Sequence, residues 1–107
     1  MAWDDITELL GRASGFQWDA AKNESNLAKH GIDFDDATEV FHGPHVILES
    51  SHNPERRWIA IGECEGRLIA VIFTCRSNEI RIISARRARK NEERTYRDKK
   101  MGRPPEG

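Results

Sequence analysis

The longest apolar run in the chain, Leu68 to Phe73, places the strongest limit on the fold. An unbroken run of this length, within a strand-like segment at 67–75, is typical of a central strand covered on both faces. Glu65-Gly66 stands directly before that segment, between two alternating apolar stretches, and predicts a two-residue hairpin turn from a strand at 57–64. The sequence therefore predicts a sheet built around 67–75.

Strand-like periodicity extends on both sides of this hairpin. Residues 45–50 predict a further strand, Asn53-Pro54 marks a loop, and Ser77-Asn78 turns the chain into a last strand at 79–85. These four strands predict an antiparallel meander, to which the short aromatic segment 16–18 can add one edge strand.

Two helices are predicted before the meander. Asp19 is a good N-cap for the first, which ends at Lys29-His30-Gly31, where the glycine supplies the left-handed C-cap position. Asp33 caps the second, and Gly43-Pro44 stops it. The apolar stripe of this second helix consists of Phe34, Ala37, Val40 and Phe41.

The two ends of the chain predict additional helices. Residues 1–15 are typical of an extra short helix, which Asp4 or Asp5 can cap. The basic segment after residue 85 contains helix formers but only two apolar side chains, Ala88 and Tyr96. A helix that is polar nearly all round needs a partner or charge pairs to be stable.

Together these elements predict a single α+β domain over residues 1–107, with 101–107 as a disordered tail. Two N-terminal helices pack on an antiparallel sheet made of a short first strand and a four-strand meander, and a basic helix follows. With 107 residues, the chain can bury only a modest core.

Charge is distributed unevenly along the chain. The segment from Met1 to Cys75 has 6 Lys and Arg against 13 Asp and Glu, whereas the segment from Arg76 to Gly107 has 11 against 5. Net charges of −7 and +6 indicate a basic face for a polyanion or for an acidic partner. A solvated charged helix with a charged tail is the alternative.

The cysteines and the first residues predict the compartment. Met1 to Leu10 is acidic and has no apolar core segment, so we expect no signal peptide. No segment approaches the roughly 20 apolar residues of a membrane span. Hairpin counting places Cys64 far from Cys75, which argues against a disulfide. We therefore expect a cytoplasmic protein with free thiols and no membrane contact.

No motif predicts a cofactor or a metal. The sequence contains no phosphate-binding glycine loop, no nucleophile elbow and no paired-cysteine site. Its histidines are His30, His42, His45 and His52. Their spacing does not enforce a zinc geometry, so we expect ordinary loop histidines.

Arginines are better candidates for a functional site. Arg57 opens a strand, Arg81 lies within one, and Arg86-Arg87 close the last strand. Guanidinium groups at such positions suit bidentate contact with phosphate. The alternative is a set of weak surface salt bridges with Glu49, Glu55 and Glu79.

Hairpin counting also predicts which arginines share a face. Arg57 lies opposite Thr74, and Thr74 lies opposite Arg81, so these three side chains point the same way. The same counting places Arg86 on the other face, unless a β-bulge in the last strand brings it back. Arg57 and Arg86 can belong to one site only with such a bulge.

Tyr96 and His30 each allow two interpretations. Tyr96 lies between Arg94 and Arg97, where it can stack on a base or lend a hydroxyl group, or instead anchor its helix on the sheet. His30 can transfer a proton, or it can belong, with Gly31, to a helix terminus.

Three groups of residues resemble motifs of the BrnT toxin family. The opening group comprises residues 16–22 (FQWDAAK), 26–31 (NLAKHG), 34–37 (FDDA) and 40–41 (VF); the middle group is 57–62 (RWIAIG); the closing group is 82–88 (IISARRA) with Glu92, Glu93, Arg94 and Tyr96. They occur in the family's order and cover residues 16–98. Residues 1–15 and the tail lie outside the resemblance.

The resemblance implies a RelE-like fold, with two helices packed on an antiparallel sheet. BrnT-like proteins are ribonuclease toxins of bacterial type II toxin–antitoxin systems, and they stop translation. The implied partner is BrnA, a small DNA-binding antitoxin of the ribbon-helix-helix type, which neutralises the toxin and represses the operon together with it. Operator DNA is then contacted only through that complex.

The implied chemistry is metal-independent RNA cleavage, in which a 2′-hydroxyl attacks the neighbouring phosphate. Such a site stabilises extra negative charge on phosphorus and moves protons. By motif position, the phosphate-binding candidates are Arg57 and Arg86, and the proton-transfer candidates are Glu55, Tyr96 and His30. The residues expected to bind RNA are Arg81, Arg87, Arg94 and Arg97.

Two alternatives to the ribonuclease remain open from sequence. One is a non-catalytic basic module that binds nucleic acid or an antitoxin and acts in operon regulation. The other is an inactive relative that is retained for regulation through complex formation. A pure binder needs the arginines but no group that transfers a proton.

Overall fold

The structure is a computed structural model that describes residues 6–51 and 55–100. Some sequence predictions fall outside these residues. They are the N-cap at Asp4 or Asp5, the segment 52–54 with its predicted loop and its histidine, and the tail at 101–107.

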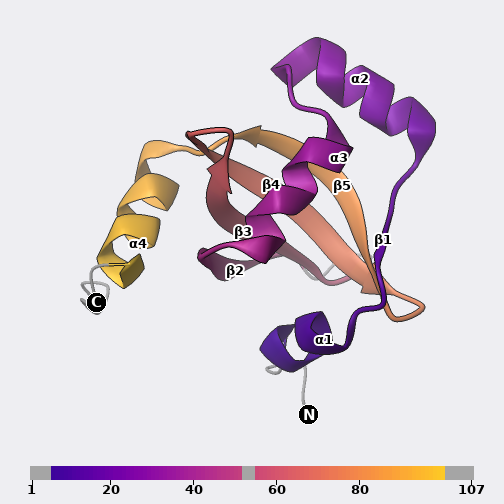
Figure 1. The fold of residues 1–107 in the computed structure, drawn as a ribbon, viewed down its shortest axis with the longest axis horizontal. Helices are drawn as coiled ribbons and strands as arrows, with labels where there is room; N and C mark the ends of the chain where they lie inside the picture. The colour runs from indigo at the N-terminus through magenta and orange to yellow at the C-terminus, as the bar shows by residue number, and fades with distance from the viewer. Residues whose placement is uncertain (1–5, 52–54, 101–107) are drawn as a thin grey trace.

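One five-stranded sheet runs through the structure in the order β1-β5-β4-β3-β2 (Figure 1). The strands are β1 (Phe16–Gln17), β2 (His45–Ser51), β3 (Arg57–Cys64), β4 (Arg67–Arg76) and β5 (Glu79–Arg87). Strands β2 to β5 form the predicted antiparallel meander, with the apolar run in the central strand β4. The prediction is confirmed for these four strands.

The pairing of β1 corrects one expectation. β1 pairs with β5 in parallel, so the sheet is mixed rather than wholly antiparallel. Backbone bonds around β1 fix its direction, since Ser14 N donates to Asn78 O at 2.9 Å and Ile80 N donates to Gly15 O at 2.9 Å. A strand of two residues has no period from which its partner or direction can be predicted.

Both tight turns of the meander have the predicted two-residue form. Glu65 and Gly66 have φ angles of 53° and 80°, and Ser77 and Asn78 have φ angles of 55° and 63°. Positive φ at both central positions is the type I′ geometry, whose twist matches that of the flanking strands. The two cysteines are free, as predicted.

The predicted helices are present. They are α1 (Ile6–Arg12), α2 (Ala20–His30), α3 (Phe34–Ala37) and α4 (Lys90–Lys100). Asp19 caps α2 by accepting two backbone N–H groups from its first turn, and Gly31 ends α2 with a φ of 72°. Both ends of α2 therefore lie where the sequence places them.

The second predicted helix changes its geometry part-way. It is α-helical only as α3 and continues as the 3-10 helix η2 (Thr38–His42). The Thr38 hydroxyl donates to the Asp35 carbonyl at 2.7 Å. Such a local side-chain bond competes with the α-helical ladder, and the sequence pattern of apolar residues does not report it.

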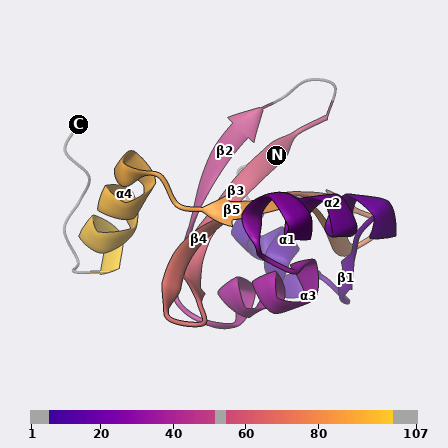
Figure 2. The same ribbon diagram turned by 90° about the horizontal axis from the view of Figure 1, so that it is seen from above.

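Hydrophobic clusters lie on both faces of the sheet. Helices α1, α2 and α3 lie on one side of the sheet and α4 lies on the other (Figure 2). The fully buried side chains of the larger cluster include Phe34, Val40, Val71, Phe73 and Ile82. A smaller cluster joins Val46, Ile61 and Tyr96 beneath α4. Strand β4 is central in the sheet, as predicted; one of its faces lies under the larger cluster, and on the other face Leu68, at the start of the strand, packs against the smaller cluster.

The buried side chain of Asn26 holds α2 against the edge of β5. Its Nδ2 donates to Ala85 O at 3.0 Å, and its Oδ1 accepts from Ala85 N at 3.1 Å. The same Nδ2 also donates to Ile32 O at 3.0 Å, just after α2 ends. One amide thus takes the place of a neighbouring strand at a point on β5 that the short β1 does not reach.

Candidate functional site

A row of polar side chains crosses the sheet on the face opposite α1, α2 and α3. Thr74 pairs with Arg81, and Arg81 pairs with Gln17. Because Trp58 pairs with Phe73, the preceding residue Arg57 lies opposite Thr74. We call the part of this face that carries Gln17, Arg57, Thr74, Arg81, Ser84 and Arg86 the open face.

A β-bulge in β5 brings Ser84 and Arg86 onto the open face. Ile72 pairs with Ser84, but the next residue of β4, Phe73, pairs with Ile82, so Ile83 is the extra residue. Simple hairpin counting places Arg86 on the opposite face; the bulge reverses that assignment. Arg57 and Arg86 therefore do share a face.

Arg57 is a loosely held cation. Its side chain is 34% exposed, and its Nη2 lies 3.7 Å from Glu55 Oε2. Glu55 is closer to Arg76, at 3.1 Å. The Nε of Arg57 is buried and has no hydrogen-bond partner among the described residues. The salt bridge with Glu55 that the sequence offered as an alternative is present but long, so Arg57 retains donors for an anion.

Arg81 is oriented without being neutralised. Its Nη1 donates to Gln17 Oε1 at 2.7 Å, and Gln17 Nε2 donates to Glu79 Oε1 at 2.8 Å. A neutral amide thus stands between Arg81 and Glu79, the carboxylate that the sequence suggested as a salt-bridge partner. Arg81 has no ion pair within the described part of the chain.

Thr74 lies between these two arginines and is only 4% exposed. Its Oγ1 donates to Arg56 O at 2.7 Å, which ties β4 to the backbone residue directly before Arg57. The row therefore has a fixed floor, with one guanidinium group on each side of it.

Unlike Arg57 and Arg81, Arg86 is closely paired with a carboxylate. Its Nη1 and Nη2 donate to the two carboxylate oxygens of Glu92, both at 2.9 Å. The two side chains are 16% and 5% exposed. Hydrogen bonds from Arg86, with a further one from Arg89 N, lower the pKa of Glu92 although burial opposes this. Arg86 is therefore neutralised and fastens the first turn of α4 to the end of β5.

Sequence reasoning missed Glu92 as the partner of Arg86. A signal for its position does exist, because Glu92 is the third residue of α4 and accepts from the N–H of Arg89, the residue just before the helix. A glutamate at this position is the second half of a capping box. The sequence could thus predict the helix start, but not that Arg86 would reach the same carboxylate.

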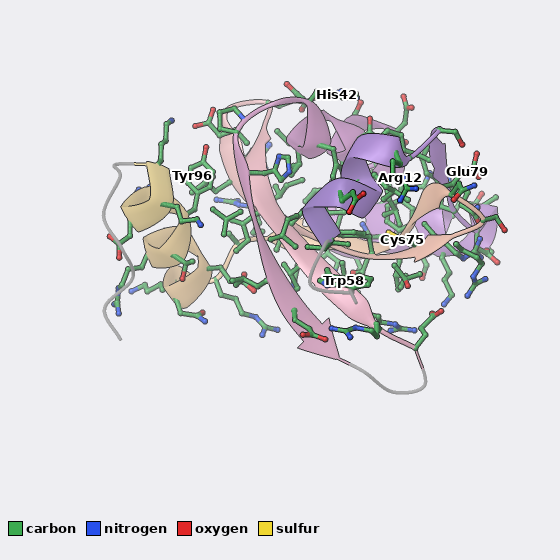
Figure 3. All side chains as sticks on the ribbon, turned by 90° about the horizontal axis from the view of Figure 1, so that it is seen from below. Arg12, His42, Trp58, Cys75, Glu79 and Tyr96 are labelled. Carbon is green, nitrogen blue, oxygen red and sulfur yellow. The ribbon has the colours of Figure 1, made fainter. Side chains whose placement is uncertain are left out.

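Tyr96 is only 4% exposed and packs with Val46 and Ile61, so its placement matches the docking interpretation. Figure 3 shows it on the side of α4 that faces the sheet. Ile61 is four residues from Arg57 along β3, which corresponds to about 13 Å. His30 ends α2 beside Gly31, at the β5 edge. Neither Tyr96 nor His30 joins the row.

The remaining predicted RNA-binding arginines lie at the end of β5 and on α4. Arg87 and Arg97 line a pocket of about 330 Å³ between the β3–β4 turn and α4. Carboxylates share this pocket, and Arg97 Nη1 lies 3.6 Å from Glu93 Oε1. Arg94 is exposed on α4. The structure thus places Glu55 beside Arg57 and places Arg57 in one row with Arg81, while the second basic group lies at the end of β5 and on α4.

Histidines and acidic side chains do not gather into a metal-binding group in residues 6–51 and 55–100. His45 Nδ1 lies 2.8 Å from Gly43 O, and the His42 ring contacts Phe16. Burial, with Glu39, Glu65 and Asp36 nearby, raises the pKa of the Cys64 thiol to about 11. This thiol is therefore held in its neutral form at physiological pH.

Residues 18–92 match the family model described as "Ribonuclease toxin, BrnT, of type II toxin-antitoxin system". This chain belongs to the BrnT toxin family. The match lies within residues 16–98, where the sequence resembles the family's motifs, so the prediction of the family is confirmed. Ribonuclease activity and an antitoxin partner accordingly belong to its family.

A solved BrnT structure agrees with the fold. The 1.1 Å crystal structure of the Brucella abortus ribonuclease toxin BrnT is 37% identical to this chain, with a TM-score of 0.60. The alignment covers 71% of this chain and 97% of that one. A comparison with curated proteins returned no match. Within the described residues of this BrnT chain, no helix is long and apolar enough to cross a membrane.

Proposed function

We propose that this BrnT family protein is a metal-independent endoribonuclease that cuts RNA on the open face and thereby stops translation. The observation that carries the proposal is the row of Arg57, Thr74 and Arg81. Two cations without a close carboxylate partner stand on either side of a small, fixed side chain. Their Cα atoms are two strands apart, about 10 Å, so one phosphate can be approached by both guanidinium groups.

These residues suit cleavage by the neighbouring 2′-hydroxyl. Attack of that oxygen adds negative charge to the phosphate, and permanently charged guanidinium groups stabilise it. Glu55 Oε2 lies 3.7 Å from Arg57, and we assign to it the removal of the 2′-hydroxyl proton. As the 2′-oxygen bonds to phosphorus, the bond from phosphorus to the 5′-oxygen breaks, a 2′,3′-cyclic phosphate is left, and solvent water protonates the departing 5′-oxygen. Arg86 and Tyr96 hold α4 in this proposal, and His30 lines a separate pocket.

An RNA assay in the presence of EDTA tests the proposal. Purified protein should cleave a single-stranded RNA at an unchanged rate when EDTA is added, and the Arg57→Ala variant should cleave it about 100-fold more slowly. Binding of RNA without cleavage by the wild type would instead support the non-catalytic module. Cleavage that EDTA abolishes and Mg²⁺ restores would overturn metal independence.

A second experiment tests the effect on translation. Addition of the protein to a cell-free translation reaction should stop protein synthesis.

We also propose the identity of the partner that the family implies. A BrnA-like ribbon-helix-helix protein would neutralise this chain and carry the complex to operator DNA, in the cytoplasm. The basic segment from Arg76 onward, with its net charge of +6, is compatible with an acidic partner surface. Co-expression with the neighbouring reading frame should relieve growth arrest and yield a co-purifying complex; toxicity that persists beside a soluble BrnA-like protein would exclude that partner.

A further inference from the structure

A second basic site lies outside the row of Arg57, Thr74 and Arg81. It is a pocket of about 200 Å³ between α2 and the bulged part of β5. It is lined by Lys22, Ser25, Asn26, Lys29, His30, Ile83 and Ser84. The residues from α2 recur at helical spacing, so that they form one stripe along the side of the helix that faces β5.

The floor of this α2–β5 pocket is fixed. Asn26 is 7% exposed and is held by Ala85 and Ile32 through its amide. The Ser84 hydroxyl donates to Asn26 Oδ1 at 3.3 Å. The pocket is therefore already formed in the free protein, and a ligand need not order α2 or β5 in order to bind there.

Charge in this pocket is of one sign. Lys22 and Lys29 line it, both are exposed, and neither forms a salt bridge with any described residue. No carboxylate is among its lining residues. The pockets beside Glu79 and beside Glu93, by contrast, place carboxylates next to their arginines. Two lysine ammonium groups without a carboxylate favour an anion.

We propose that the α2–β5 pocket binds a phosphate of the same RNA strand that is cut on the open face. This inference rests on the proposed ribonuclease function and extends its site. Ser84 reaches the open face through the bulge, three residues along β5 from Arg81, which is about 10 Å. The phosphate bound here is thus not the one that is cut, but one further along the strand.

The role of this pocket is to bind and align the RNA strand. Lysines act on phosphate as point charges and carry no base specificity, so they add affinity for any RNA sequence. Loss of either lysine should raise KM and leave kcat unchanged, because neither touches the reacting atoms in this proposal.

Salt dependence of RNA binding tests the pocket directly. The probe is a 2′-O-methylated RNA oligonucleotide, which cannot be cleaved by its own 2′-oxygen, followed by fluorescence anisotropy over a range of salt concentrations. Lys22→Ala and Lys29→Ala should each weaken binding several-fold and reduce the slope of log K against log salt by about 0.7. Lys29→Arg should retain both the affinity for RNA and the salt slope of the wild type. Arg12→Ala is the matched control, since it removes an exposed cation on α1, outside the pocket.

The outcomes separate this inference from the proposed function. If the wild type binds and cuts RNA but both lysine variants keep the KM and the salt slope of the wild type, the pocket does not bind the RNA. The proposed ribonuclease function is then unaffected. If the wild type neither binds nor cuts RNA, both the proposed ribonuclease function and the RNA-binding role of the pocket are overturned. A fall in kcat with unchanged KM would also overturn the binding role. Lysine variants that bind RNA normally but no longer bind the antitoxin would likewise overturn the RNA-binding role of the pocket.

Discussion

Arg57 and Arg86 lie on the same face of the same sheet, yet their surroundings differ. Arg57 is 34% exposed and its nearest carboxylate contact is 3.7 Å away. Arg86 is 16% exposed and makes two 2.9 Å bonds to a carboxylate that is itself buried. The first arginine keeps donors for an incoming anion, whereas the donors of the second are used by the fold. Residue type and face therefore do not decide whether an arginine is free to bind an anion; its carboxylate partner does.

The largest expected effect is a loss of folding stability when the ion pair between Arg86 and Glu92 is broken. Glu92→Ala leaves the Arg86 charge, whose side chain is only 16% exposed, without its partner, and breaking such a pair from one side typically destabilises a protein by about 3 kcal/mol. The melting temperature should fall by roughly 15 °C. The double variant Arg86→Met/Glu92→Leu removes both charges and should recover most of the loss. A Glu92→Ala variant as stable as the wild type would remove the fastening role of the pair.

The next effect lies at the Arg57 end and concerns activity. Arg57→Ala should lower kcat for RNA cleavage by about 100-fold, the typical result of removing one charge-stabilising donor. Its melting temperature should stay within a few degrees of the wild type, because the side chain is partly exposed and loosely paired. Steady-state cleavage and thermal melting of the same preparation measure both quantities. Equal losses of stability from Arg57→Ala and Glu92→Ala would erase the contrast between the two arginines.

A smaller effect is expected from Gln17, which orients Arg81 without neutralising it. Gln17→Ala removes the 2.7 Å bond to Arg81 Nη1 and frees Glu79 to pair with that arginine. We expect KM for RNA to rise by roughly 3- to 10-fold, since one charge-assisted hydrogen bond is lost and the cation is partly neutralised. Gln17→Glu, which supplies a carboxylate directly, should be worse. Normal KM in both variants would exclude Arg81 from the site.

The smallest expected effect is a pH dependence of stability at the Arg86 end. The native pKa of Glu92 is lowered, so the unfolded chain takes up a proton at this residue more readily than the native protein does. The stability that the pair provides is full above the ordinary glutamate pKa of 4.5 and is lost as the pH falls below it toward the native value. Denaturant titrations between pH 3 and 6 should show a shallower pH dependence for Glu92→Gln than for the wild type. If the wild type and Glu92→Gln show the same pH dependence of stability, Glu92 does not contribute to it.

Much of the fold could be predicted because local chemistry specifies it. The turn at Glu65-Gly66 and the apolar run after it fix the β3–β4 hairpin, and Asp19 and Gly31 fix both ends of α2. The parallel direction of β1 could not be predicted, because it depends on backbone contacts with residues 78–80, far along the chain.

The candidate site was predictable in part. Counting residues across the hairpins placed Arg57, Thr74 and Arg81 on one face, and the structure has the same register for Thr74 and Arg81. Counting also showed that a bulge was needed for Arg86, but no residue type near Ile83 specifies one. Nor does any local pattern reveal that Arg86 would be neutralised, since its partner lies on a separate element.

The single amide of Asn26 has a consequence for how this chain behaves in a crowded solution. Beyond the short β1, the outer side of β5 would present unpaired backbone groups, which are a template for strand addition and aggregation. Asn26 occupies the N–H and C=O of Ala85 and keeps α2 over that edge. An extended segment of another molecule can pair there only after it has displaced a helix. At this edge, one side chain thus gives the protection that a further strand would otherwise provide.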